Sequence, residues 1–233
     1  MPTPTFSYFP IRGRGFVGRA LLHSAGVEFN DDRVPLETWE TVKATTPYGH
    51  VPFYQDDTVG VLTESGTIYR YLARAHGFAG STAIEQVRVD EIFEIYFDIF
   101  RAAQKAYFGA DAGGETVVRE SETLSRQKFL ANAVPQYVAL TTRLLARNGN
   151  RGFLVGNSLT LADFQAFHVL NNWLRPLSPA AIAEVQPYLD GVRKANARFN
   201  SYLTNGGVAV TTEPSVFTFL NTPELFQGEF DNC

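Results

Sequence analysis

The sequence changes character near residue 80, and this change limits the folds that the chain can adopt. Before it, short segments rich in β-branched and aromatic residues alternate with short segments of helical spacing, which predicts the order β-α-β-α-β-β-α. After it, apolar residues recur every three or four positions, which is typical of packed helices. We therefore predict an α/β domain over residues 1–82, an all-α domain over residues 83–205, and a C-terminal extension over residues 206–233.

The first domain is expected to contain strands and helices of modest length. The strands are predicted at residues 5–9, 27–34, 51–55 and 58–63, and the last two flank Asp56 and Asp57 as a hairpin. The helices are predicted at residues 16–25, at 36–43 and from residue 65 onward, and Gly26 and Gly77 suit their C-terminal ends.

The second domain is expected to consist of helices only. They are predicted over residues 84–107, 115–147 and 160–174, with one or two more over residues 187–203. Pro135 should kink the second of these, because a proline inside a helix lacks the N–H that the ladder needs. Thr160 suits an N-cap, and Asp163 places a carboxylate in the first turn of the helix that follows.

Charge and cysteine content exclude several functions. The chain has 20 Lys and Arg against 24 Asp and Glu, a net charge of −4, which argues against a nucleic-acid partner. Its single cysteine, Cys233, cannot form an internal disulfide, a CxxC pair or a thiolate zinc site, and fits a reducing cytoplasm. No apolar run is long enough for a membrane span, no signal peptide is evident, and the four histidines lack metal-site spacing.

The segment Gly13–Gly18 matches the dinucleotide-binding pattern G-x-G-x-x-G between a predicted strand and a predicted helix. Asp31, at the end of the next strand, occupies the position of the ribose-binding acid. A doubly wound domain needs further β-α units, however, and this chain makes one hairpin and then becomes helical. We therefore interpret these glycines as shaping a strand-to-helix turn.

Five segments, taken in order, resemble the cytosolic glutathione S-transferases, most closely the sigma class that includes the hematopoietic prostaglandin D synthases. The segments are residues 7–15, 29–34, 46–52, 64–72 and 156–164, with Trp39 and Lys43 between the second and the third, and together the resemblance covers residues 1–205. It implies a thioredoxin-like N-terminal domain, an all-α C-terminal domain, glutathione as co-substrate and a cytoplasmic homodimer. The implied reaction is attack of the glutathione thiolate on a small apolar electrophile.

The resemblance assigns the catalytic roles to Tyr8 and Arg14. A thiol with a pKa near 8.5 is only about 3% ionised at pH 7, and the thiolate is the nucleophile. A phenol keeps its proton at that pH, so Tyr8 can donate a hydrogen bond to the sulfur without acting as a base. Arg14 would support it electrostatically. The alternative is that Tyr8 is one more half-buried strand aromatic.

The resemblance also implies a set of glutathione contacts. Val51 would pair its backbone with the cysteinyl unit beside a cis Pro52, and Ser65 at a helix N-terminus would hold the γ-glutamyl carboxylate. Further contacts are implied for residues that surround the tripeptide: Trp39, Lys43, His50, Glu64 and, from the neighbouring subunit, Asp98. A solvated Lys43, a packed Trp39, an edge-strand Pro52, an ordinary N-cap at Ser65 and a surface charge at Asp98 are the structural alternatives.

The electrophile is expected in an apolar cleft lined from the first turn and the fourth helix. The candidate residues are Phe9, Ile11, Arg12, Ala102, Ala103, Ala106 and Tyr107. No metal is expected, because the positions that match the metal ligands of prostaglandin D synthase are Glu94, Phe97 and Asp98, and phenylalanine cannot ligate.

Two other functions remain open, a glutathione-dependent isomerase of the prostaglandin D synthase kind and a non-catalytic protein such as a lens S-crystallin. The extension keeps several aromatic residues, so it is expected either to cover the electrophile cleft or to cover apolar surface elsewhere.

Overall fold

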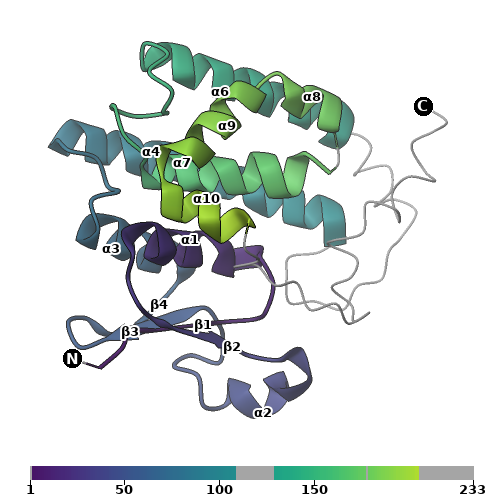
Figure 1. The fold of residues 1–233 in the computed structure, drawn as a ribbon. Coiled ribbons are helices and arrows are strands. Elements are labelled where there is room, and N and C mark those ends of the chain that lie inside the picture. The colour runs from purple at the N-terminus through teal and green to yellow at the C-terminus, as the bar shows by residue number, and fades with distance from the viewer. Residues whose placement is uncertain (1, 109–128, 177, 205–233) are drawn as a thin grey trace. The chain divides into compact units, whose positions relative to one another are not determined.

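The computed structural model describes residues 2–108, 129–176 and 178–204, and it divides into two compact units (Figure 1). One, the N-terminal unit, contains Met1–Tyr69 together with the chain from Arg198 onward. The other, the helical unit, contains Arg70–Ala197. The extension over residues 206–233 lies outside the described residues, and the domain boundaries predicted from the sequence stay a prediction.

A four-stranded mixed sheet forms the centre of the N-terminal unit. Its order is β2-β1-β3-β4, with β1 (Thr5–Tyr8) parallel to β2 (Asn30–Arg33) and antiparallel to β3 (Phe53–Asp56). β4 (Gly60–Thr63) pairs antiparallel with β3, which confirms the predicted hairpin. Phe6, Ser7 and Tyr8 are all buried, because both faces of the central strand are covered.

The helix α1 (Phe16–Ala25) begins and ends at the predicted residues. Gly26 takes a left-handed φ of 70° and its N–H bonds the last carbonyls of the helix, as the sequence predicted for a C-terminal cap. The short α2 (Trp39–Lys43) follows a 3₁₀ turn, and α3 (Ser65–Ala75) follows β4. The helix α10 (Ala197–Thr204) places Phe199 and Tyr202 against α1, with ring centroids 6.5 and 6.0 Å from that of Phe16.

The helical unit contains the long helix α4 (Ala83–Phe108), which packs against α7 (Leu161–Phe167). The remaining helices are α6 (Val134–Arg147), α8 (Pro179–Ala183) and α9 (Gln186–Ala195), with π-helical segments at Phe129–Ala133 and His168–Leu174. The predicted cap of α7 is confirmed. Asp163 is fully buried and accepts hydrogen bonds from the Thr160 N–H and hydroxyl, the Leu154 N–H and the Tyr188 hydroxyl, at 2.9–3.0 Å.

Some predicted elements differ from those observed. The second strand is limited to Asn30–Arg33 rather than residues 27–34, and the first ends at Tyr8. The helix predicted over residues 160–174 widens to π geometry at His168. Pro135 lies in the first turn of α6, directly after a π-helical segment, where its missing N–H is tolerated. The helix Pro179–Ala183 was not predicted, and residues 115–128 lie outside the described part of the chain.

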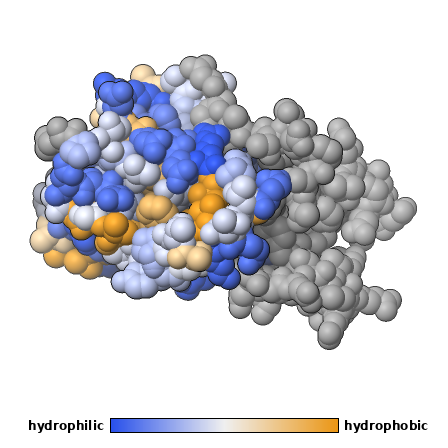
Figure 2. All heavy atoms as spheres, turned by 90° about the horizontal axis from the view of Figure 1, so that it is seen from below, coloured by the Kyte–Doolittle hydropathy of each residue, from blue (hydrophilic) through white to orange (hydrophobic). Residues whose placement is uncertain are grey.

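The surface carries scattered apolar side chains. Figure 2 shows several separate apolar areas among hydrophilic ones on the face in view. Among the described residues, Tyr48, Val61, Ile84 and Val87 are the large hydrophobic side chains that stand exposed. None of the described helices is both long and apolar enough to cross a bilayer.

Candidate active site

Tyr8 is the last residue of β1, and its hydroxyl lies beside the turn that follows the strand. Only 7% of the residue is exposed, and its Oη accepts a hydrogen bond of 3.1 Å from the Arg14 N–H. Burial raises the pKa of Tyr8, while that hydrogen bond and the charges of Arg14 and Arg19 oppose the rise. The phenol therefore stays protonated at neutral pH. Because its oxygen already accepts from Arg14, its own proton remains available to donate.

The turn Gly13–Gly15 follows β1 as a 3₁₀ turn and lies against the ring of Tyr8. A Cβ on Gly13 would stand 2.7 Å from Tyr8 Oη, and one on Gly15 would stand 2.5 Å from Tyr8 Cδ1. A Cβ on Gly18, one turn into α1, would stand 2.4 Å from the Phe6 ring. The three glycines of the G-x-G-x-x-G pattern are thus required by close packing, which agrees with their interpretation as a strand-to-helix turn.

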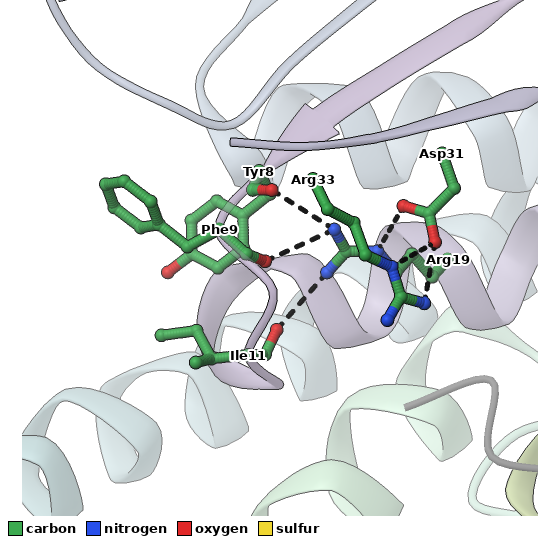
Figure 3. A network of polar contacts seen from close by, with 6 residues as sticks. All are labelled: Tyr8, Phe9, Ile11, Arg19, Asp31 and Arg33. Carbon is green, nitrogen blue, oxygen red and sulfur yellow. Dashed lines mark hydrogen bonds and ion pairs between the residues drawn. The ribbon is translucent and has the colours of Figure 1, made fainter. Parts of the chain in front are cut away.

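Arg19 connects this turn to the sheet, and it was not among the predicted site residues (Figure 3). The side chain is buried and donates to the backbone carbonyls of Tyr8, Phe9 and Ile11 at 3.2–3.3 Å. Its Nε also donates to Asp31 Oδ1 at 2.7 Å, so the aspartate that fitted a ribose-binding acid is instead an ion-pair partner. One guanidinium therefore fixes the segment that carries Tyr8. The available signal was an arginine within a predicted helix whose other residues are mostly apolar.

The aromatic ring of Phe9 lies beside both the ring of Tyr8 and the ring of Trp39. The ring centroids of Tyr8 and Phe9 are 5.3 Å apart, and Phe9 meets Trp39 edge to face at 5.1 Å. Trp39 begins α2 and Lys43 ends it one turn later, with its side chain exposed. Lys43 Cε lies 4.0 Å from the position that a Cβ on Gly49 would occupy, which brings α2 close to the loop before β3.

That loop carries His50, Val51 and Pro52, and the Val51–Pro52 bond is cis as the resemblance implied. His50 Nδ1 lies 3.0 Å from the Tyr48 carbonyl oxygen, which accepts only, so this nitrogen carries the proton. His50 Nε2 lies 3.4 Å from Glu64 Oε1, so an imidazole and a carboxylate face each other at this point.

The N-terminus of α3 adds the last group of the N-terminal unit. Glu64 precedes it with a left-handed φ of 65°, unusual for a residue other than glycine. Ser65 opens the helix and is 2% exposed, and its Oγ interacts with the Tyr69 hydroxyl but makes no hydrogen bond of good geometry with the residues that the structure describes. A buried hydroxyl at the positive end of a helix suits an anionic group such as a carboxylate.

Arg12 directly precedes the turn Gly13–Gly15, and the predicted residues of the helical unit all lie on α4. Asp98 is exposed and lies 3.6 Å from Arg101, whereas Phe97 is buried and its ring stacks on Phe93 with centroids 5.4 Å apart. Ala102 is half-buried and Ala103 is fully buried, and the side chains of Ala106 and Tyr107 lie outside the described residues. No group of three or more metal-ligating side chains occurs among the residues that the structure describes.

Comparison with known proteins identifies the family. A model described as the N-terminal domain of glutathione S-transferase matches residues 4–74, and one described as its C-terminal domain matches residues 115–205. Glutathione S-transferase 1 of Ascaris suum is 35% identical over 83% of this chain and 92% of its own length. S-crystallin 4 of Enteroctopus dofleini is 30% identical over 74% of this chain and 81% of its own length. The structure of the sigma class enzyme of Fasciola hepatica is 26% identical, with a TM-score of 0.74 over 87% of this chain and 96% of that one.

The mixed sheet with its surrounding helices is a thioredoxin-like domain, and an all-helical domain accompanies it. The chain belongs to the glutathione S-transferase family. The predicted fold and the predicted type of enzyme, a glutathione transferase with sigma-class relatives, are confirmed by these relatives.

Proposed function

We propose that the chain conjugates glutathione to small apolar electrophiles, and that the Tyr8 hydroxyl stabilises the thiolate that attacks. The observation that carries this proposal is the protonated, buried phenol whose oxygen is already occupied by the Arg14 N–H. A hydrogen bond to a charged acceptor contributes about 1.5–3 kcal/mol, which lowers the thiol pKa by about one to two units. A thiol with a usual pKa near 8.5 is then about a quarter to three quarters ionised at pH 7.

Glutathione would be held along the edge of the N-terminal unit. Ser65 and the N-terminus of α3 would bind the γ-glutamyl carboxylate, and Glu64, whose Oε1 lies 3.4 Å from His50 Nε2, would face the γ-glutamyl ammonium. Val51 would offer its backbone N–H and C=O to the cysteinyl unit. Trp39 and Lys43 would bind the glycine carboxylate through an indole N–H and a charge.

The helical unit and the partners complete the proposal. Asp98 would act from the neighbouring subunit of a homodimer in the cytoplasm, and no metal would take part. The electrophile would contact Phe9, Ile11 and Arg12, which lie between β1 and the turn Gly13–Gly15. The sulfur forms a bond to the electrophilic carbon, the leaving group departs with its electron pair, and the thiol proton passes to solvent.

The test compares the full chain with its Tyr8→Phe variant in the conjugation of 1-chloro-2,4-dinitrobenzene, in which chloride leaves. Loss of one hydrogen bond to the thiolate should lower kcat/KM about 10- to 100-fold. The matched control is Tyr96→Phe, which removes another buried hydroxyl, the one bonded to Thr141 at 2.7 Å in the helical unit. A Tyr8→Phe variant as active as the unmodified chain would refute the proposed mechanism.

The likeness to an S-crystallin supports a second candidate, a structural protein on the same fold. The retained set of Tyr8, Arg14, Trp39, Lys43 and Ser65 argues against it, because a protein without catalysis does not need these side chains. The same assay separates the two functions, since a structural protein shows no conjugation above the spontaneous rate. Incubation with prostaglandin H2 and analysis of the products tests the isomerase alternative.

A further inference from the structure

Tyr69 lies in α3 and contacts the turn that orients the Tyr8 hydroxyl. We propose that Tyr69 is a positioning residue for the transferase reaction, which acts on Tyr8 through the backbone of Arg14. The proposal rests on the proposed function, because it assumes that the Tyr8 hydroxyl faces the glutathione sulfur.

Two hydrogen bonds link the tyrosines through Arg14. The Tyr69 hydroxyl donates to the Arg14 carbonyl oxygen, and the Arg14 N–H donates to Tyr8 Oη at 3.1 Å. Both tyrosines are buried, with 2% and 7% of their surface exposed, so water does not compete easily for either bond. The two phenols thus hold opposite sides of one residue, and a shift of the Arg14 backbone changes the hydrogen bond that Tyr8 accepts.

The direction of the Tyr8 proton depends on that accepted bond. A phenol oxygen donates one hydrogen and accepts through its lone pairs. When the Arg14 N–H occupies the acceptor side, the O–H bond points away from Arg14. If the Arg14 amide moves, the hydroxyl can rotate, and its hydrogen bond to a thiolate weakens because such bonds need near-linear geometry.

Both neighbours of Arg14 within the turn are glycines. Gly13 and Gly15 have no side chains, and a Cβ on either would collide with Tyr8. Glycine is the residue with the greatest backbone freedom, so contacts from outside the turn must fix its geometry. Tyr69 supplies such a contact from a helix 55 positions later in the chain.

The Tyr69 hydroxyl keeps its proton and therefore remains a hydrogen-bond donor. Burial is the main cause that raises the pKa of Tyr69 well above the usual value for a phenol, and the neighbouring Tyr8 adds to the rise. The Tyr69 hydroxyl therefore keeps its proton throughout the pH range in which glutathione ionises. The hydrogen bond to Arg14 is present in both protonation states of the substrate.

One helix carries both Tyr69 and the proposed ligand of the γ-glutamyl carboxylate. Ser65 opens α3 and Tyr69 lies four residues later, which places the two side chains on the same face of the helix. In the proposed complex, Ser65 of α3 would hold the γ-glutamyl end of the tripeptide. Tyr69 of the same helix would hold Arg14 and thereby orient the Tyr8 hydroxyl that faces the sulfur. Loss of the Tyr69 hydroxyl should then disturb the ionisation of the thiol and leave the binding of the tripeptide intact.

The experiment is a comparison of Tyr69→Phe, Tyr8→Phe and the double variant, each as the full chain, with Tyr96→Phe as control. The readout is the ultraviolet absorbance of the thiolate of bound glutathione across pH, together with kcat and KM for glutathione. Phenylalanine keeps the ring and removes one oxygen atom, and circular dichroism establishes that each variant is folded.

For Tyr69→Phe we expect the titration midpoint of the bound thiol to rise by about half a unit to one unit and kcat to fall about 3- to 10-fold, since one pKa unit is a tenfold change. KM for glutathione should stay within about two-fold, because the binding groups are unchanged. In the double variant, removal of the Tyr69 hydroxyl should add little to the effect of Tyr8→Phe, because both act on one hydrogen bond.

Two results would overturn the inference. One is a folded Tyr69→Phe variant with an unchanged midpoint and unchanged kcat while Tyr8→Phe loses activity, which leaves the proposed function intact. The other is a double variant in which removal of the Tyr69 hydroxyl lowers kcat by the same factor as it does in the chain that keeps Tyr8. That result would mean that Tyr69 acts on something other than Tyr8. If Tyr8→Phe itself changes neither readout, the proposed function has failed instead.

Discussion

Replacement of Arg19 by methionine tests whether one buried guanidinium holds the segment that carries Tyr8. Methionine keeps the unbranched apolar stem and removes every donor. Arg19 is 3% exposed and, among the described residues, donates hydrogen bonds to three backbone carbonyls and to Asp31. The variant therefore removes charge and hydrogen bonds with little change in packed volume.

The expected loss of stability depends on which hydrogen bonds each partner of Arg19 retains in the variant. Asp31 retains Arg33 Nη2 at 2.8 Å and is 22% exposed, so it does not become a buried unpaired charge. The Tyr8 carbonyl retains the Val34 N–H at 3.2 Å. The carbonyls of Phe9 and Ile11 lose the arginine donor, and an unsatisfied buried group costs about 1–3 kcal/mol. Because both residues are only half-buried, we expect the free energy of unfolding to fall by about 2–4 kcal/mol.

Urea unfolding followed by circular dichroism measures this loss, with Arg33→Met as the matched control. Arg33 is 28% exposed and Asp31 keeps Arg19 in that variant, so its loss should stay below about 1 kcal/mol. An Arg19→Met variant within about 0.5 kcal/mol of the unmodified chain would contradict the role given to this network.

Two further predictions concern the ionisation of Tyr8 and the packing of a glycine. Because burial raises the pKa of Tyr8, its protonated form persists as pH rises. The value of kcat/KM should therefore increase as glutathione ionises and then stay level to at least about pH 9.5. A pH–rate profile in which kcat/KM already falls below about pH 9 would be inconsistent with this. Gly18→Ala should destabilise the fold by about 1–3 kcal/mol because its Cβ meets the buried Phe6 ring, whereas Gly191→Ala in α9, with no atom within 4 Å of its Cβ, should stabilise it by up to about 1 kcal/mol. Thermal unfolding of both variants would contradict the packing argument if the two shifts had the same sign.

Local signals in the sequence predicted the parts of the fold that depend on neighbouring residues. The bounds of α1 follow from helical spacing and from Gly26, whose left-handed conformation ends the helix. The cap at Thr160 and Asp163 follows from a spacing of three residues. The short helix Pro179–Ala183 was missed, because five residues carry too little periodicity to be distinguished from a turn.

The connections within the candidate site could not be predicted in the same way. Tyr69 and Arg14 are 55 residues apart, and the helical spacing of α3 shows that Tyr69 faces inward without showing which carbonyl it meets. The ion pair of Arg19 with Asp31 depends on how α1 crosses the parallel strands, which is a property of the folded sheet. The candidate residues themselves came from motifs, whereas the hydrogen bonds that orient them come from tertiary structure.

The return of α10 to the N-terminal unit has a consequence for synthesis of the protein. Tyr202 stacks on His23 with ring centroids 4.7 Å apart, and Phe199 lies against Phe16, so α1 is covered by residues that are synthesised only after the whole helical unit. While the chain is growing, the apolar face of α1 that these residues cover stays open until the helical unit has been synthesised. Domains usually fold in the order in which they emerge. Here the N-terminal unit cannot be completed before the helical unit has been made, which gives a nascent-chain chaperone time to bind at α1.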